Sequence, residues 1–175
     1  MEPFAKFYDG WTERLGEFVE LFPVHPDYIK TFERLPVVEQ RGVLQVLSLK
    51  FEQMKDDELP QDYPGVLAFD SFWSFIKEKS ALSSDEDIRL TKECSDLLTS
   101  KVSSGFPKNR KQYEGMANRI VEGLSVHRLT THDVNAPIGM TPEEIRDQLC
   151  LYHPFVAELG GADPSEDLLT LVDKT

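Results

Sequence analysis

The spacing of apolar residues limits what this chain can fold into. Apolar positions recur every three or four residues along most of the sequence, whereas the strict alternation typical of a half-buried strand is nearly absent. Prolines and helix-start signals divide the pattern into short segments. The clearest start is Thr141-Pro142-Glu143-Glu144, which combines an N-cap residue, a first-position proline and acidic residues in the first turn. The sequence therefore predicts an all-α fold of seven or eight short helices.

The breaks in the pattern give the expected elements. Helices are predicted at residues 4–22, 27–34, 37–54, 72–76, from the start signal at 83–87 onward, 113–129, 142–152 and from the cap at 163–166 onward. Residues 66–69 are expected to be extended, and Asp70 or Ser71 is expected to cap the helix that follows. A soft boundary near residues 101–112 separates two predicted domains, 1–105 and 106–175.

Two of these helices have predicted buried faces that the structure can test. The expected buried residues of the first are Trp11, Leu15, Phe18, Val19 and Phe22. Those of the helix that starts after 83–87 are Ile88, Leu90, Cys94, Leu97 and Leu98.

Composition narrows the class of protein. The chain has 175 residues and a net charge of -12, from 19 Lys and Arg against 31 Asp and Glu. It lacks an apolar run of the ~20 residues that a membrane span needs, and its N-terminus does not resemble a secretory signal. Cys94 and Cys150 are far apart; a disulfide between them is one alternative, but the usage fits a reducing compartment. We expect a soluble cytoplasmic protein with no membrane partner.

The histidines do not predict a metal site. His127 and His132, with Asp133 alongside, come closest to a ligand cluster, but zinc sites normally combine ligands at tighter spacing. The alternative, polar residues at a helix end and in the following loop, is preferred, and no metal is expected. His25, between two prolines, is predicted to be a structural turn residue rather than a ligand.

One basic stretch stands out from the acidic chain. Lys101, Lys108, Arg110 and Lys111 lie in a segment without acidic residues, and its Ser, Gly, Pro and Asn content predicts an exposed loop. Such a loop could contact phosphate groups of nucleic acid, but it is more often solvated or paired with acidic neighbours. Because the overall charge opposes binding to DNA, DNA binding is not expected.

Sequence motifs for catalysis are missing. The chain has no GxxxxGK[ST] phosphate loop, no GxGxxG and no GxSxG. The acidic groups at 56–58 and 85–87 are explained by a solvated loop and a helix start. We therefore expect no enzymatic activity and no cofactor from this chain alone.

Most of the chain resembles one family in order. The stretches that carry the resemblance are LFPVHPDYI at 21–29, FER at 32–34, QRGVLQVLS at 40–48, PG at 64–65, DSFW at 70–73, LSVHRLTT at 124–131 and APIGMTPEEIRDQLCL at 136–151. They look like the large P-loop ATPases of BREX-type (PglY/BrxC-like) phage-exclusion defence loci. The family's proteins are much longer, and this chain resembles an internal piece of them.

The resemblance implies a fold and a role for Arg41. The first part of the chain would be an AAA+-like helical lid, in which Arg41 points at nucleotide phosphates, with ATP and Mg²⁺ bound by the missing core. The alternative is that Arg41 pairs with Glu33 or Glu39 on a solvated face. The second part would be a helix-turn-helix of truncated winged-helix type, formed by residues 117–129, 142–152 and 164 onward. The last of these helices is acidic, which disfavours docking on DNA.

Three hypotheses result. The leading one is a non-catalytic lid and adaptor region of a phage-resistance ATPase, with the rest of the parent ATPase as its partner. The second is a free-standing helical module that binds other proteins, such as other defence-system proteins or a second copy of itself. The third is a nucleic-acid-binding module that uses the basic stretch at 101–111.

Overall fold

The computed structural model describes residues 6–35, 40–56, 58, 64–79, 84–131, 139–156 and 161–175. These residues form eight α-helices, two 3-10 helices and no strand, which confirms the all-α prediction. The α-helices are α1 (Leu15–Leu21), α2 (Pro26–Glu33), α3 (Gln40–Asp56), α4 (Phe72–Glu78), α5 (Glu86–Gly105), α6 (Glu114–Thr130), α7 (Pro142–Gln148) and α9 (Pro164–Lys174), and the 3-10 helices are η2 (Phe69–Ser71) and η4 (Lys108–Tyr113).

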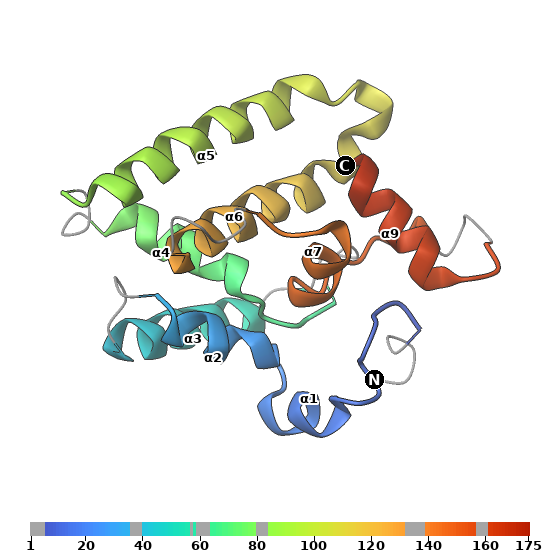
Figure 1. The fold of residues 1–175 in the computed structure, drawn as a ribbon, viewed down its shortest axis with the longest axis horizontal. Coiled ribbons are helices and arrows are strands. Elements are labelled where there is room, and N and C mark those ends of the chain that lie inside the picture. The colour runs from blue at the N-terminus through green and yellow to red at the C-terminus, as the bar shows by residue number, and fades with distance from the viewer. Residues whose placement is uncertain are drawn as a thin grey trace.

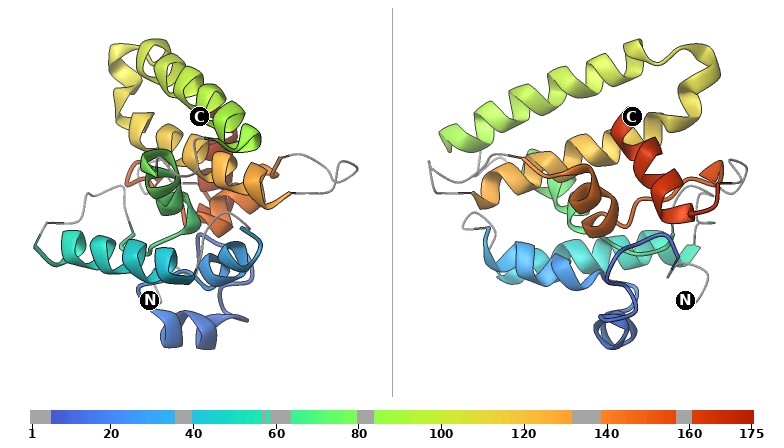
Figure 2. Two further views of the ribbon diagram at one scale, coloured as in Figure 1. Left: turned by 90° about the vertical axis from the view of Figure 1, so that its left-hand side faces the viewer. Right: turned by 45° about the vertical axis from the view of Figure 1, so that its right-hand side comes forward.

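Helix α6 lies at the centre of the fold (Figure 1, Figure 2) and packs against α4, α5 and η2. Its buried residues occupy several faces of the helix, as expected for an element with neighbours on more than one side. They are Met116, Ala117, Val121, Gly123, Ser125, Val126, Leu129 and Thr130. Gly123 lies where α6 meets the chain after α7, and a Cβ atom there would lie 2.6 Å from Cδ1 of Leu149, so the buried Leu149 side chain would have to shift.

A partly buried ion pair joins η2 to α6. Arg119 Nε donates to Asp70 Oδ2 at 2.7 Å, and Arg119 Nη2 donates to the Leu149 carbonyl at 2.6 Å. The prediction that the side chain of Asp70 or Ser71 caps the next helix is wrong, because α4 has no hydrogen bond from a capping side chain. Ser71 precedes α4 without a side-chain cap bond, because it lies in η2 and its hydroxyl donates to the Ala68 carbonyl.

The predicted helix at 4–22 is much shorter in the structure. Residues 6–14 form turns that include Gly10 at φ +67°, a left-handed conformation that ends regular helix, so that only α1 is helical. Trp11 and Phe18 are buried as predicted, but Leu15, Val19 and Phe22 are exposed. The reason is that Trp11 reaches the core from a turn and stacks on Phe18 with ring centroids 3.8 Å apart, so the two do not mark one face of a long helix.

The next two helices agree with prediction, and so does the segment predicted to be extended, 66–69, except that Phe69 begins η2. Helix α2 starts at Pro26, and α3 covers nearly the predicted range. The segment before η2 is extended, and Val24 and Leu67 form an isolated parallel bridge. This bridge holds the start of α2 against the centre of the molecule.

The C-terminal helices begin where the sequence predicted, but α7 ends at Gln148 and not at residue 152, since Cys150 has a left-handed φ of +48° that does not continue a helix. Thr141 and Glu144 form a capping box at the start of α7, and Asp163 caps α9 by accepting from the Ser165 backbone N–H at 2.9 Å. Helix α7 packs against α9. The helix-turn-helix assignment of α6, α7 and α9 stays a prediction, since their helical content alone does not establish a winged-helix arrangement.

One hydrophobic core contains residues from both predicted domains, from Phe7 to Val172. The predicted boundary at residues 105 and 106 falls just after α5, which packs on α6 across it. The two-domain division stays a prediction.

Candidate functional site

Arg41, the predicted nucleotide sensor, is the second residue of α3, and its side chain is exposed. It makes no ion pair or hydrogen bond with another described residue, Glu33 included. The other suggested partner, Glu39, lies outside the described residues. Among the described residues, nothing therefore occupies the exposed Arg41 guanidinium.

The basic stretch at 101–111 is exposed as predicted, but it is not a loop. Lys101 lies in the last turns of α5, and Lys108, Arg110 and Lys111 lie in η4. The Ser and Gly residues that suggested a loop continue α5 to Gly105, where Ser104 Oγ donates to the Ser100 carbonyl at 2.9 Å. None of the four basic residues forms an ion pair with a described residue.

In the described part of the chain, no group of three or more His, Cys, Asp or Glu side chains is placed to hold a metal ion. His132 and Asp133 lie outside the described residues, and His127 is half-buried in α6, where burial lowers its pKa. His25 is the N-cap of α2, because its Nδ1 accepts from the Asp27 backbone N–H at 3.1 Å. Both cysteines are free, Cys94 exposed and Cys150 buried, so the disulfide alternative is wrong.

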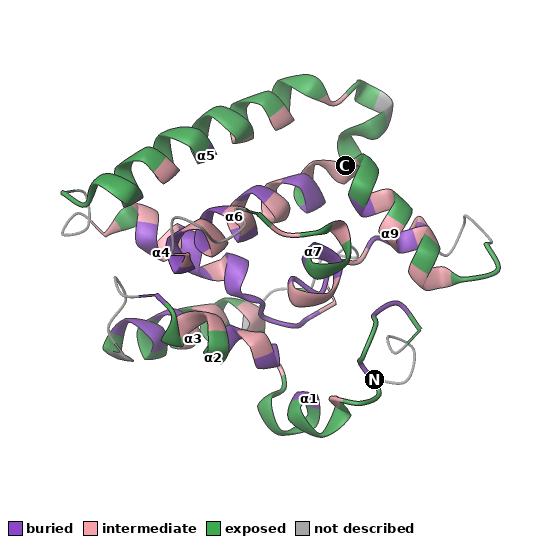
Figure 3. Cartoon of the chain, viewed as in Figure 1, coloured by how far each residue is buried: buried purple, intermediate pink, exposed green. Residues whose placement is uncertain are grey.

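Helix α5 is the most unusual surface element. It has 20 residues, yet only Ile88 and Ser95 are buried, and Figure 3 shows it exposed along almost its whole length. The prediction that Leu90, Cys94, Leu97 and Leu98 are buried is wrong. The three leucines are 48%, 56% and 38% exposed, because α5 lies on the outside of α6 with no described helix on its other side.

A groove runs between α5 and α6, which we call the α5–α6 groove. It consists of two adjoining hollows of about 470 and 260 Å³, which share Leu98, Val121 and Leu124. The α5 residues that line it are Asp87, Leu90, Thr91, Cys94, Leu98, Lys101, Val102 and Gly105. The α6 residues are Ala117, Ile120, Val121, Leu124, Ser125 and Arg128. Most of this lining is apolar or small.

The two ends of the groove differ in charge. At the end near the start of α5, Asp87 and Arg128 form a long ion pair of 3.9 Å, so these charges balance. At the other end, Lys101 and Arg110 line the groove and have no acidic partner among the described residues. The α5–α6 groove is therefore apolar along its length and basic at one end.

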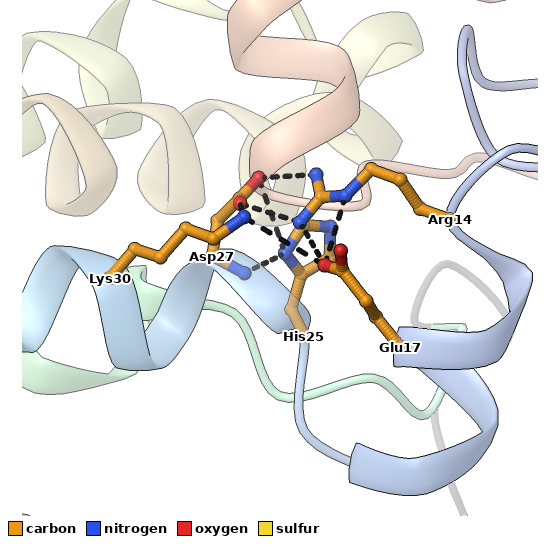
Figure 4. A network of polar contacts seen from close by, with 5 residues as sticks. All are labelled: Arg14, Glu17, His25, Asp27 and Lys30. Carbon is orange, nitrogen blue, oxygen red and sulfur yellow. Dashed lines mark hydrogen bonds and ion pairs between the residues drawn. The ribbon is translucent and has the colours of Figure 1, made fainter.

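A second site lies where the N-terminal turns meet α2, shown in Figure 4. Arg14 makes a two-pronged contact with Asp27, with Nη2 to Oδ1 at 2.7 Å and Nη1 to Oδ2 at 3.0 Å. Glu17 and Lys30 complete the network. Burial is the largest influence on the pKa of Asp27 and would raise it, but the hydrogen bonds from Arg14, together with the charges of His25, Arg14 and Lys30, lower that pKa overall. Burial also lowers the pKa of His25 from 6.5 to about 4, against the attraction of Asp27.

A buried arginine holds the neighbouring elements together. Arg146 in α7 is 1% exposed, and its guanidinium contacts Asp9 in the turns, Asp147 in α7 and Ser165 in α9, each at 2.6 Å. Burial opposes the charge, but the hydrogen bonds to Asp147 and Asp9 and the negative charges of these two residues raise the pKa of Arg146. The pKa of Asp147 is raised by burial and by the nearby charge of Asp9, although Arg146 acts in the opposite direction.

Between these two networks lies a pocket of about 240 Å³, which we call the acidic pocket. Its lining residues are Tyr8, Asp9, Gly10, Trp11, Arg14, Phe18, His25, Asp27, Glu143, Glu144, Asp147 and Gln148. They come from the N-terminal turns, from α1 and α2, and from α7, so the pocket exists only because distant segments meet.

Comparison with known proteins identifies the family. The whole chain, residues 1–175, matches the family described as DUF6079 second domain. The chain belongs to this family. No curated protein and no solved structure matches this chain. In the described part of the domain, no helix is long and apolar enough to cross a membrane.

Sequence reasoning missed most of the side chains that form the two sites of this DUF6079 second domain. Neither Arg14 nor Arg146 was a candidate, because a single arginine in an acidic chain normally pairs on the surface. One signal for Arg146 was present: it directly follows Ile145 and precedes Leu149 by three positions, which places it next to the buried face of α7.

Proposed function

We propose that this DUF6079 second domain is a non-catalytic protein-interaction domain that binds a partner helix in the α5–α6 groove. The observation that carries the proposal is the row of exposed apolar residues along α5, facing apolar residues of α6. Apolar side chains left uncovered in a continuous groove are typical of a surface that another protein covers.

The groove favours an amphipathic helix with acidic residues near one end. Two neighbouring helices with apolar faces form a slot that a third helix can fill with side chains spaced at i, i+3, i+4 and i+7. Lys101 and Arg110 would meet the acidic end of that helix, since they have no acidic partner among the described residues. Charge complementarity of this kind fixes the direction in which the helix lies.

The family description supports an adaptor role within a larger protein, because it names a second domain. The partner helix would then belong to another part of the parent protein or to a protein bound to it. That the parent is a phage-resistance ATPase rests on the sequence resemblance alone.

The test uses a designed amphipathic helical peptide with three glutamates near one end, and measures its binding to the domain by fluorescence anisotropy. Leu98 lines both hollows of the groove, whereas Leu97 is its neighbour on α5 and lines neither. Leu98→Gln should weaken binding about tenfold, because a buried leucine contributes about 1.5 kcal/mol or more. Leu97→Gln is the matched control and should bind normally.

Further measurements test the direction of the peptide in the α5–α6 groove and the alternative ligands, which are a second copy of the domain and DNA. A peptide with lysines in place of the glutamates should bind more weakly; equal binding by both peptides would argue against the proposed direction. Sedimentation of the domain alone detects self-association through the same groove. A titration with duplex DNA at low and high salt tests the nucleic-acid hypothesis, for which binding must fall steeply with salt.

We also propose a second candidate function, nucleotide sensing by Arg41 in the parent protein. Its support is the exposure of Arg41 in the first turn of α3 without a described partner. An arginine can make a charge-assisted contact with phosphate and respond to its loss on hydrolysis. Arg41→Ala in the full-length parent should abolish ATP turnover and leave the helical content of this domain unchanged. Unchanged turnover would remove Arg41 from the mechanism.

A further inference from the structure

The acidic pocket has an aromatic wall. The rings of Tyr8 and Trp11 stack with centroids 5.3 Å apart, and those of Trp11 and Phe18 stack at 3.8 Å. All three residues line the pocket and are almost fully buried. The negative faces of such rings attract cations, most strongly where water is excluded.

Negative charge is in excess around this wall. Five carboxylates line the pocket, namely those of Asp9, Asp27, Glu143, Glu144 and Asp147. Among the described residues, Arg14, Lys30 and Arg146 are the cations that pair with members of this group, so two negative charges remain unbalanced. Asp9 is 73% exposed, and Glu143 is exposed and forms no ion pair with a described residue. These two carboxylates are accessible from solvent.

The pocket already shows how it can hold a guanidinium. Cζ of Arg14 lies 5.9 Å from the ring centroid of Phe18, while its nitrogens contact both oxygens of Asp27. An aromatic face and a carboxylate together make a favourable site for a planar cation. Tyr8 and Trp11, with Asp9 and Glu143, provide the same two kinds of group elsewhere in the pocket lining.

A buried donor in the wall lacks an acceptor. Trp11 is 5% exposed, and its indole N–H has no hydrogen-bond partner among the described residues. An unsatisfied buried N–H costs about 1–3 kcal/mol, so buried donors are normally paired. By contrast, the other tryptophan, Trp73, donates its indole N–H to Ser95 at 2.8 Å.

We propose that the acidic pocket binds an arginine or lysine side chain of a peptide segment, with the cation between the aromatic wall and the carboxylates. The adjacent backbone carbonyl of the peptide supplies the acceptor for the Trp11 N–H. A free polyamine offers the positive charge but no acceptor, which is why a peptide fits better. This site is separate from the α5–α6 groove and does not depend on the function proposed for it.

The two tryptophans allow a direct test in the 175-residue chain. The probe is N-acetyl-arginine N-methylamide, and the readout is the pair of indole N–H signals in a ¹H–¹⁵N spectrum, assigned with Trp11→Phe. The Trp11 signal should move on titration and the Trp73 signal should not. The citrulline analogue of the probe has the same shape without the charge, and it should leave both signals in place.

Variants then locate the site. Glu143→Gln should raise the dissociation constant by about two- to fivefold, as expected for one exposed carboxylate. Glu166→Gln is the matched control, since Glu166 is also an exposed acid in the first turn of a helix, and it should bind like the wild type. An unmoved Trp11 signal, an equal response to citrulline, or an equal loss in Glu166→Gln would overturn the proposal. Spermidine binding as tightly as the arginine probe would overturn the peptide assignment.

Discussion

His25 combines two roles that favour its neutral form. It is 2% exposed, and its Nδ1 lone pair accepts the backbone N–H of Asp27 at the start of α2. Protonation would place a charge in a buried position and would remove the acceptor. The rigid turn between the two prolines, predicted from sequence, is thus also a helix cap.

The domain should therefore lose stability as the pH falls. The pKa of His25 is 6.5 in the unfolded chain and about 4 in the folded one, so the unfolded state binds more protons between these values. The contribution of neutral His25 to the free energy of unfolding is fully present above pH 6.5. It falls by about 3 kcal/mol as the pH is lowered toward 4. His25→Asn keeps a cap acceptor without titrating, and urea unfolding from pH 4 to 7 should show a shallower pH dependence for it. If the free energy of unfolding depended on pH equally in the wild type and in His25→Asn, His25 would not be the source of this pH dependence.

Arg146 is the second residue with an effect beyond its own helix. Its guanidinium joins the N-terminal turns, α7 and α9. Arg146→Met should lower the free energy of unfolding by about 3 kcal/mol, because Asp147 is left partly buried without its partner. Arg89→Met, which removes an exposed arginine from pairs with Glu86 and Glu93, should cost under about 1 kcal/mol in the same denaturation measurement. Equal losses in the free energy of unfolding of both variants would refute the conclusion that Arg146 joins the three elements.

At the scale of elements, α5 packs against α6 but buries only two of its 20 residues. Ile88 and Ser95 are its buried residues, and Ser95 accepts the indole N–H of Trp73 in α4. An exposed ion pair between Lys77 and Asp96 adds little. A helix with so few buried residues can open locally while the rest of the domain stays folded.

Ser95→Ala should loosen α5 in particular. The change leaves the Trp73 N–H buried without an acceptor, which costs about 1–3 kcal/mol. Hydrogen exchange should rise in α5 and stay unchanged in α6 and α7. Ser103→Ala, at an exposed position of the same helix, serves as the control and should leave exchange as it is. A uniform rise across all helices would show that α5 does not open on its own.

At the scale of the whole molecule, one core decides how the chain unfolds. The core includes Phe7 near the start, Trp73 in α4 and Val172 near the end, on both sides of the predicted boundary. We expect one cooperative thermal transition, with equal calorimetric and van't Hoff enthalpies, since a single packed core melts as a unit. Two separate transitions would instead support the division at residue 105.

The sequence by itself determined the helical class, the approximate ends of α2, α3 and α6, and the start and cap of α7. These depend on local properties: helical spacing, proline positions and side chains that bind nearby backbone groups. It also indicated correctly that His25 is structural, because a histidine between two prolines is already held in a turn.

The tertiary structure alone decided which apolar faces are covered and which polar groups meet. Leu15 and Val19 in α1, like Leu90 and Leu97 in α5, have helical spacing, but spacing cannot show whether another helix lies against that face. Likewise, Asp9 meets Arg146 across 137 positions of the chain. Contacts of that kind depend on how the whole core packs, so both the α5–α6 groove and the acidic pocket appear only in the folded molecule.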